Sequence, residues 1–301
     1  MAKLYIFGNG FDCKHGLSTS YHNFSRFMRN DFTKVYQELG NAFFPNNPDM
    51  LWSDFENNMG KFDPLVWYLH NQAWCANHNS CDLSEKFEDY QTQMQACFEL
   101  WIKDKEEEIE NIKPVLDLTP DDFYINFNYT EVLEQVYGIP SSHILHIHGD
   151  ASVDRAELLV VGHGLTEDDI TTIGKKSLDS IERTITDESL NRPSQSSVTP
   201  YVCADESQKF LTLLRKDTES IIAKHKAFFA KLRRASNCID EVIILGHSLF
   251  AVDVPYFRHL SDNVLDPDTK WKVNIYPRDN ESVILARFKE AMGFDAEPAY
   301  L

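Results

Sequence analysis

The sequence lacks the features of membrane and secreted proteins. No apolar run reaches the roughly 18 to 20 residues that a membrane-spanning helix needs, and the N-terminus has no basic stretch, apolar segment and cleavage site in succession. The six cysteines include no C-x-x-C pair, which argues against a disulfide framework and a four-cysteine zinc site. We therefore expect a cytoplasmic protein with free thiols and no membrane partner.

Basic residues are scarce, with 29 Lys and Arg against 47 Asp and Glu and a net charge of −18. Binding to nucleic acid requires clustered cations that neutralise phosphates. The tightest basic cluster, Lys231, Arg233 and Arg234, lies at the end of a predicted helix, where cations interact favourably with the helix dipole. We therefore do not expect a nucleic-acid partner.

Short β-rich runs alternate with helical stretches, which is typical of an α/β protein. Such alternation predicts a Rossmann-like, mostly parallel sheet of about six strands that is covered on both faces. The predicted strands are residues 4–7, 123–127, 144–147, 158–161, 242–245 and 273–276. The predicted helices span residues 24–39, 51–62, 87–112, 208–234, 256–260 and 282–292.

The first predicted strand is separated from its partners by about one hundred residues of helical sequence. Residues 22–116 are therefore predicted to form a helical insertion, or cap, in a core made of residues 1–21 and 117–301. Aromatic residues repeat along these helices and are expected to pack between them. Residues 186–200 are rich in polar residues and are predicted to form an exposed loop or lid.

A complete dinucleotide-binding fingerprint, G-x-G-x-x-G, is also missing. The first strand is followed by Gly8-Asn9-Gly10-Phe11-Asp12, but Cys13 occupies the position of the third glycine, and the next glycine is Gly16. Glycines at such a place permit a tight turn or the close approach of a ligand. The loop, together with Gly16 and Ser20, is predicted to bind a nucleotide phosphate, with an ordinary turn as the alternative.

Polar residues follow the other predicted strands as well. Ligands of open α/β sheets bind beyond the carboxyl ends of the strands, so these positions are candidates for one shared site. They include Asn128, His148 before Gly149, Gly162-His163-Gly164, and Gly246-His247-Ser248 with Asp253 downstream. His148 is the natural general base, because an unperturbed imidazole titrates near neutrality.

Two other chemistries fit these residues poorly. A His146–His148 pair has no acidic partner at a recognisable metal-binding spacing, so we expect no metal. The segment Gly246-His247-Ser248-Leu249-Phe250 has Phe250 at the final glycine position of the nucleophile elbow, which argues against a hydrolase of that fold. Ser248 is instead expected to contact phosphate or ribose oxygens.

Together these residues resemble the bacteriophage abortive-infection AbiH family. The resemblance is carried by the segments Gly8 to Asp12, His15 to Tyr21 with Phe24, Trp52-Ser53-Asp54-Phe55-Glu56, Asn126-Phe127-Asn128-Tyr129-Thr130, His146-Ile147-His148-Gly149 and Gly246-His247-Ser248. The resemblance implies an antiphage role in bacteria and a phage-derived trigger.

The order of these motifs is also distantly similar to sirtuin-like NAD-consuming domains. That similarity implies that Asn128 orients the ribose or the attacking water, that His148 acts as a base, and that the glycine loops hold the pyrophosphate. Thr130 stands where the sirtuin-like pattern has an aspartate that contacts nicotinamide, a role that Asp12 or Asp253 could take. The zinc cysteines of deacetylating sirtuins are absent, which argues against protein deacetylation.

NAD hydrolysis is thus the leading prediction, with NAD or a related adenine nucleotide as the small-molecule ligand. One alternative is a non-catalytic module that senses a nucleotide. Another is an RNA-acting toxin, which the acidic charge disfavours. The role of Glu56, in the predicted helical insertion, is left open.

Overall fold

The computed structural model describes residues 2–152, 158–184, 198–277 and 279–301. Most of the predicted lid, residues 186–200, lies outside these ranges. Contacts divide the chain into two compact units. The sheet unit comprises Met1–Ser20, Glu99–Val160 and Asp217–Leu301, and the helical unit comprises Tyr21–Phe98 and Val161–Lys216.

The sheet unit is built on six parallel strands in the order β3-β2-β1-β4-β5-β6. This arrangement confirms the predicted Rossmann-like fold and has the strand order of dinucleotide-binding sheets. The strands are β1 (Ala2–Phe7), β2 (Phe123–Asn126), β3 (Ile144–His146), β4 (Ile239–Leu245), β5 (Lys270–Asn274) and β6 (Glu297–Ala299).

One predicted strand is wrong and one strand was missed. Residues 158–161 form no strand; the N–H group of Val160 donates to the carbonyl oxygen of His148, and its carbonyl oxygen accepts a hydrogen bond from the hydroxyl of Tyr129. The sixth strand is β6, which pairs with β5 at the edge of the sheet. It contains Pro298, which lacks the N–H for a ladder bond and is tolerated at an edge.

Alternation along the strands divides the sheet unit into two buried clusters. In β1, Leu4 and Ile6 belong to one cluster, whereas Tyr5 and Phe7 belong to the other. This period of two places an apolar surface on each face of the sheet. Helices complete the clusters with Leu232 of α13, Phe257 of α14 and Phe288 of α15 on the first, and Phe11 of α1 and Leu133 of α9 on the second.

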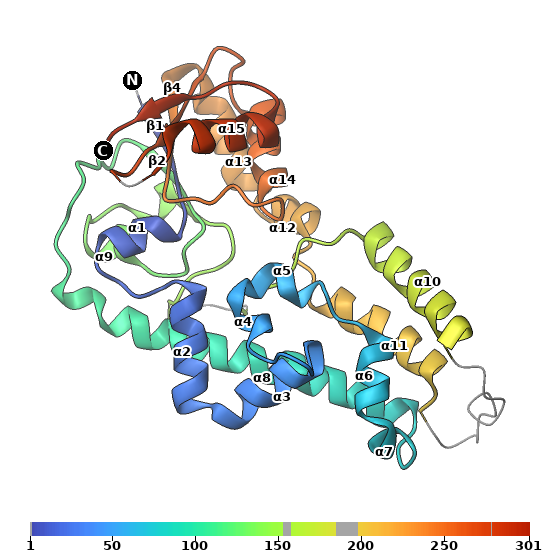
Figure 1. Ribbon diagram of the computed structural model, residues 1–301. Coiled ribbons are helices and arrows are strands. Elements are labelled where there is room, and N and C mark those ends of the chain that lie inside the picture. The colour runs from blue at the N-terminus through green and yellow to red at the C-terminus, as the bar shows by residue number, and fades with distance from the viewer. Residues whose placement is uncertain (1, 153–157, 185–197, 278) are drawn as a thin grey trace. The chain divides into compact units, whose positions relative to one another are not determined.

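The sheet unit has α-helices of its own among the described residues, several of them labelled in Figure 1. They are α1 (Asn9–Lys14), α9 (Val132–Gln135), α12 (Thr218–Lys224), α13 (Lys226–Ala235), α14 (Val254–His259) and α15 (Glu281–Met292). The single helix predicted over residues 208–234 is wrong, because Asp217 caps the start of α12 and His225 separates α12 from α13. The helices predicted over residues 256–260 and 282–292 are confirmed as α14 and α15.

The helical unit contains α2 (Tyr21–Asp31), α3 (Thr33–Phe43), α4 (Met50–Ser53), α5 (Phe55–Met59), α6 (Pro64–His70), α7 (Gln72–Cys75), α10 (Glu167–Thr184) and α11 (Pro200–Leu213). The long α8 (Ser80–Glu107) begins in this unit and ends in the sheet unit. In the ranges that the structure describes, no helix combines the length and apolar character needed to cross a membrane.

Two of the predicted helices are each broken once. Phe32 separates α2 from α3 with a φ of −130° and a ψ of 43°, and Asp54 separates α4 from α5 with a φ of −150° and a ψ of 74°. Their apolar spacing remains helical, but the breaks bring aromatic rings together: the rings of Trp52 and Phe55 stack at 5.3 Å, and Phe24 packs edge-on against Phe55 at 5.4 Å. The predicted packing of aromatic residues between helices is therefore confirmed.

Residues 161–216 group with the helices, although the sequence-based division assigned them to the core. The reason is that α10 and α11 pack against each other and against α6. A buried ion pair joins the two chain segments of this unit: Lys216 Nζ lies 2.5 Å from Glu56 Oε1, which also accepts a hydrogen bond from the hydroxyl of Tyr21. Glu56 thus has partners within the helical unit.

Candidate functional site

The carboxyl ends of β1 and β4 mark the point where the chain switches from one half of the sheet to the other. From β1 the chain continues to β2 and β3 on one side, and then to β4, β5 and β6 on the other. Ligands of open α/β sheets bind in the crevice at such a switch point. Gly8 to Asp12 and Gly246 to Ser248 follow these two strands, but the first segment is a loop only at Gly8, because α1 begins at Asn9. The glycine loop predicted there is therefore the tight turn from β1 into α1.

The glycines of these loops allow the two backbones to pack against each other. The N–H groups of Gly8 and Gly10 donate to the carbonyl oxygens of Leu245 and Gly246, at 3.0 and 2.9 Å. A Cβ atom on Gly10 would lie 2.6 Å from the Cα atom of Gly246. Glycine is therefore required here by close approach of protein backbone, and these two N–H groups already have partners.

Substituting Gly10 with alanine should lower the free energy of unfolding by roughly 3 kcal/mol, because neither backbone can move away from the added methyl group without breaking the hydrogen bond from the N–H of Gly10 to the carbonyl oxygen of Gly246. Chemical denaturation of the purified protein measures this loss. Gly138 is the control, since it has a φ of 64° but no atom within 4 Å of an added Cβ. Gly138→Ala should cost only about 1 kcal/mol, and equal losses for the two variants would contradict the packing role.

Gly16 and Phe11, two further residues of the predicted site, each have a role in the local structure. Gly16 has a φ of 88° and follows the short helix α1, where a left-handed glycine ends a helix. The side chain of Phe11 is fully buried and stacks on Phe7 with ring centroids 4.1 Å apart. Binding of a ligand through Gly16 or Phe11 stays a prediction.

Asp12 is fully buried directly after the first glycine loop. Its Oδ2 atom accepts a hydrogen bond of 2.8 Å from the hydroxyl of Thr130. Burial raises the pKa of Asp12 to about 7, against the smaller lowering effects of hydrogen bonds from Thr130 and Thr19. The neighbouring Asn9 donates to the carbonyl and the hydroxyl of Thr19, just before Ser20. A buried carboxyl group with a raised pKa at a strand end is a functional-site candidate.

The raised pKa of Asp12 predicts a pH-dependent stability difference between the protein and its Asp12→Asn variant. The folded state holds the proton more tightly than the unfolded state, where the pKa is about 3.9. Stability is therefore lost as pH rises from about 4 to beyond 7, by as much as a few kcal/mol. Denaturation from pH 4 to 8 should show the variant gaining relative to the wild type as pH increases. A difference that is constant with pH would refute the raised pKa.

Asn128 links the ends of β2 and β1. Its Nδ2 atom donates to the carbonyl oxygen of Gly8 at 3.1 Å, and its backbone N–H donates to Oδ1 of Asn126 at 3.0 Å. Both asparagine side chains are buried. The predicted residue Asn128 is therefore fixed against the first glycine loop.

Three of the predicted residues, His148, His247 and Asp253, meet in a buried cluster, which we call the His–Asp–His cluster. Asp253 Oδ1 lies 3.8 Å from His148 Nε2, and Asp253 Oδ2 lies 3.4 Å from His247 Nε2. The ring of Phe127, the residue before Asn128, packs edge-on against both imidazoles at centroid distances of 5.3 and 4.4 Å. The cluster thus lies just beyond three strands, since Phe127 directly follows β2, His148 lies two residues after β3, and His247 lies two residues after β4.

Other predicted positions lie elsewhere. Residues Gly162-His163-Gly164 do not follow a strand of the sheet, so the prediction of a polar strand end there is wrong. His163 belongs to the helical unit, where its Nε2 atom lies 2.9 Å from the carbonyl oxygen of Leu211 and burial lowers its pKa to about 4. Ser248 accepts a hydrogen bond from Arg287 through its carbonyl oxygen, and α14 starts only at Val254. Ser248 therefore does not begin a helix.

Two features of the site have no signal in the sequence. Leu249 has a φ of 55° and is the one non-glycine residue with a positive φ among the residues described. Such a conformation in leucine is set by tertiary contacts rather than by local preference. His146 lies 2.9 Å from Oε1 of Glu134; burial alone would lower the pKa of His146, but this partner raises it.

The family comparison identifies the chain. A model of the family described as "Bacteriophage abortive infection AbiH" matches residues 4–275. The chain belongs to the AbiH family. Membership of this family implies a role in defence against bacteriophage by abortive infection, as the resemblance in sequence predicted. No curated protein and no solved structure matches this AbiH chain.

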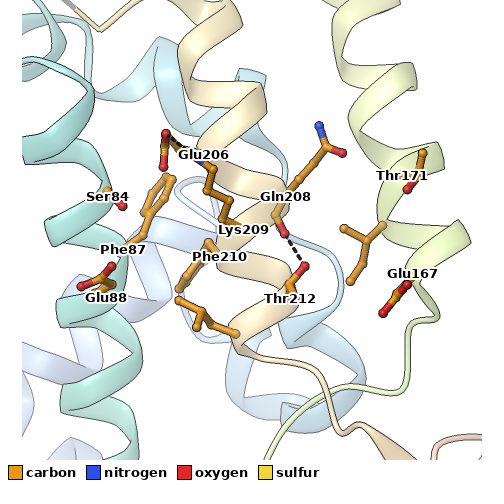
Figure 2. A pocket seen from close by; sticks show the side chains of 12 residues that line it. Ser84, Phe87, Glu88, Glu167, Thr171, Glu206, Gln208, Lys209, Phe210 and Thr212 are labelled. Carbon is orange, nitrogen blue, oxygen red and sulfur yellow. Dashed lines mark hydrogen bonds and ion pairs between the residues drawn. The ribbon is translucent and has the colours of Figure 1, made fainter.

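A concave surface with a volume of about 560 Å³ lies in the helical unit of this AbiH protein (Figure 2). Figure 2 shows Glu206 and Phe87 facing each other between α11 and α8, with Glu167 and Thr171 on α10. Glu206 is paired with Lys209 at 2.7 Å, and Glu167 with Arg215 at 3.1 Å. None of the residues predicted from the strand ends lines this surface.

Proposed function

We propose that this AbiH protein cleaves the bond between nicotinamide and ribose in NAD, or the corresponding bond of a related adenine nucleotide, when phage infection triggers it. The observation that supports this proposal is the His–Asp–His cluster, which gathers an imidazole base and its carboxylate at the switch point of a dinucleotide-type sheet. Asn128 lies beside this cluster, directly after Phe127.

The proposed reaction consumes water. The bond from C1′ to the ring nitrogen breaks, and its electron pair passes to the nitrogen, which leaves as neutral nicotinamide. A water oxygen bonds to C1′, and His148 takes the proton of that water, so NAD and water yield nicotinamide, ADP-ribose and a proton. Departure through an oxocarbenium-like state depends on positioning and charge stabilisation.

Asn128 is suited to positioning because its amide nitrogen is held by the carbonyl of Gly8. We propose that its Oδ1 atom accepts a hydrogen bond from a ribose hydroxyl or from the attacking water. The N–H groups of Gly8 and Gly10 donate to β4, so the pyrophosphate needs other donors in the proposed complex.

Asp12 provides a carboxyl group at the position where Thr130 departs from the sirtuin-like pattern. The two side chains are hydrogen-bonded to each other, although 118 residues separate them in the sequence. With a pKa raised to about 7, Asp12 is partly protonated at neutral pH and can donate a hydrogen bond to the nicotinamide carboxamide as well as accept one.

Incubation of the purified protein with NAD, followed by chromatography of the products, tests the proposal. The assay is run with and without an extract from phage-infected cells. Equal amounts of nicotinamide and ADP-ribose should appear, and they should appear only with the extract if the trigger is required. Binding of NAD without products under both conditions would contradict hydrolysis and support the sensing module. That second function is favoured by the burial of His148, which is only 2% exposed.

A further inference from the structure

The segment that precedes β2, residues 113–118, is held to the sheet unit by one hydroxyl group, and we call this segment the strap. Its side chains Leu116 and Leu118 pack against the second buried cluster of the sheet. Within the described part of the chain, no backbone group of the strap bonds to another backbone group. Instead, the N–H groups of Val115 and Leu116 donate to the hydroxyl oxygen of Tyr137, at 3.1 and 3.2 Å.

The same hydroxyl contacts His15, and the direction of this hydrogen bond follows from the other partner of the imidazole. The Nδ1 atom of His15 lies 2.7 Å from the carbonyl oxygen of Phe11, which can only accept. In the neutral ring the proton is therefore on Nδ1, and Nε2 offers its lone pair. That lone pair accepts a hydrogen bond of 2.6 Å from Tyr137. The hydroxyl thus donates to His15 while it accepts from two N–H groups of the strap.

A protonated His15 does not fit this arrangement. Its Nε2 atom would also become a donor, so three N–H groups would point at one hydroxyl oxygen, which has two lone pairs. The hydroxyl proton of Tyr137 would lose its acceptor, because no other partner of that group occurs in the ranges that the structure describes. The bonds from the strap are the ones that water can replace, since Val115 is 48% exposed.

The surroundings keep His15 neutral near pH 7. Burial lowers the pKa of His15, the hydrogen bond to the backbone raises it, and Lys14 on the same helix lowers it further. The other titratable groups are Tyr137, whose pKa is raised by burial, and Lys113 and Asp117 on the strap. Because the folded state binds this proton less readily than the unfolded state, the folded arrangement is weakened as pH falls below about 6.5.

We propose that His15 and Tyr137 form a pH-sensitive latch, which holds the strap while His15 is neutral and releases it when His15 is protonated. The other end of the latch is the carbonyl of Phe11, directly before Asp12 in α1. The latch therefore joins the strap to the helix that carries the buried carboxyl group of the candidate site. It does not depend on the proposed cleavage of NAD and is tested without a substrate.

Amide and imidazole spectra of the ¹⁵N-labelled full chain, recorded from pH 8 to pH 4.5, test the latch. At pH 8, His15 should carry its proton on Nδ1. As His15 titrates, the amide signals of Val115 and Leu116 should shift with the same midpoint, and their protection against hydrogen exchange should fall by about tenfold, the usual effect of one hydrogen bond. A proton on Nε2, a ring that stays neutral throughout, or strap signals that ignore the titration would each overturn the proposal.

Two variants separate the parts of the latch. Tyr137→Phe keeps the ring and removes the hydroxyl, so the strap amides should exchange about tenfold faster at pH 8 and change no further in acid. His15→Gln identifies the His15 signals and should abolish the pH dependence of the strap. His22→Gln is the control, since His22 is exposed on α2, and it should leave the titration unchanged. Strap signals that still titrate in both Tyr137→Phe and His15→Gln would refute the latch.

Discussion

Substitution of His148 with glutamine should lower the rate of NAD cleavage by about 100-fold or more, which is the usual contribution of a general base. Glutamine retains hydrogen-bonding groups and a similar volume, but it cannot take up a proton near neutral pH. Its effect should therefore fall on kcat rather than on folding. The measurement is the initial rate of nicotinamide release, together with a thermal melt of each protein.

His22→Gln is the control for this substitution, since His22 is exposed on α2 in the helical unit. It should leave the rate of cleavage within about twofold of the wild type, as expected for a surface position that lacks a catalytic role. A His148→Gln protein that is folded and as active as His22→Gln would show that His148 is not the base.

Substitution of Lys216 with alanine should destabilise the protein by roughly 3–5 kcal/mol, the usual cost of removing one partner of a buried ion pair. The side chain of Lys216 is 2% exposed, and its Nζ atom lies 2.5 Å from Glu56. Without the ammonium group, Glu56 remains largely buried with an uncompensated charge. Unfolding by urea, followed by circular dichroism, measures the loss.

Lys289→Ala is the control, because Lys289 makes an ion pair of 3.0 Å with Asp295 in which the two side chains are 60% and 78% exposed. Solvent screens that pair, and its loss should cost less than about 1 kcal/mol. The double variant Lys216→Met, Glu56→Met should be more stable than Lys216→Ala, since it removes both charges of the buried pair. Equal losses for Lys216→Ala and Lys289→Ala would contradict the structural role of the buried pair.

The sheet could be predicted from sequence wherever apolar strands are flanked by turns. Five of the six strands follow that pattern, but β6 consists of three residues with Pro298 in the middle. Its pairing depends on the neighbouring β5 rather than on its own preference. The false strand at residues 158–161 shows the reverse, because an apolar run does not form a strand unless a neighbouring strand pairs with it, and the backbone of Val160 bonds instead to His148 and Tyr129.

Only those residues of the candidate site that lie close to the ends of strands could be predicted from the sequence. Sheet topology brings Asn128, His148 and His247 to one edge, as expected for parallel strands. The pairing of Asp12 with Thr130 and of Asp253 with two histidines depends on tertiary contacts that no local pattern encodes. The glycines were predicted to lie in a loop, but Gly10 belongs to α1 (Asn9–Lys14), and the structure shows that Gly8 and Gly10 accommodate a neighbouring backbone.

The most direct test of the central claim is the NAD content of bacteria that express this protein during phage infection. Cells with the wild-type protein should lose most of their NAD after infection, with nicotinamide and ADP-ribose appearing together, whereas cells with His148→Gln should retain it. This experiment supplies the infection trigger within the cell. Constant NAD in infected cells in which the wild-type protein still blocks phage growth would contradict the proposed reaction.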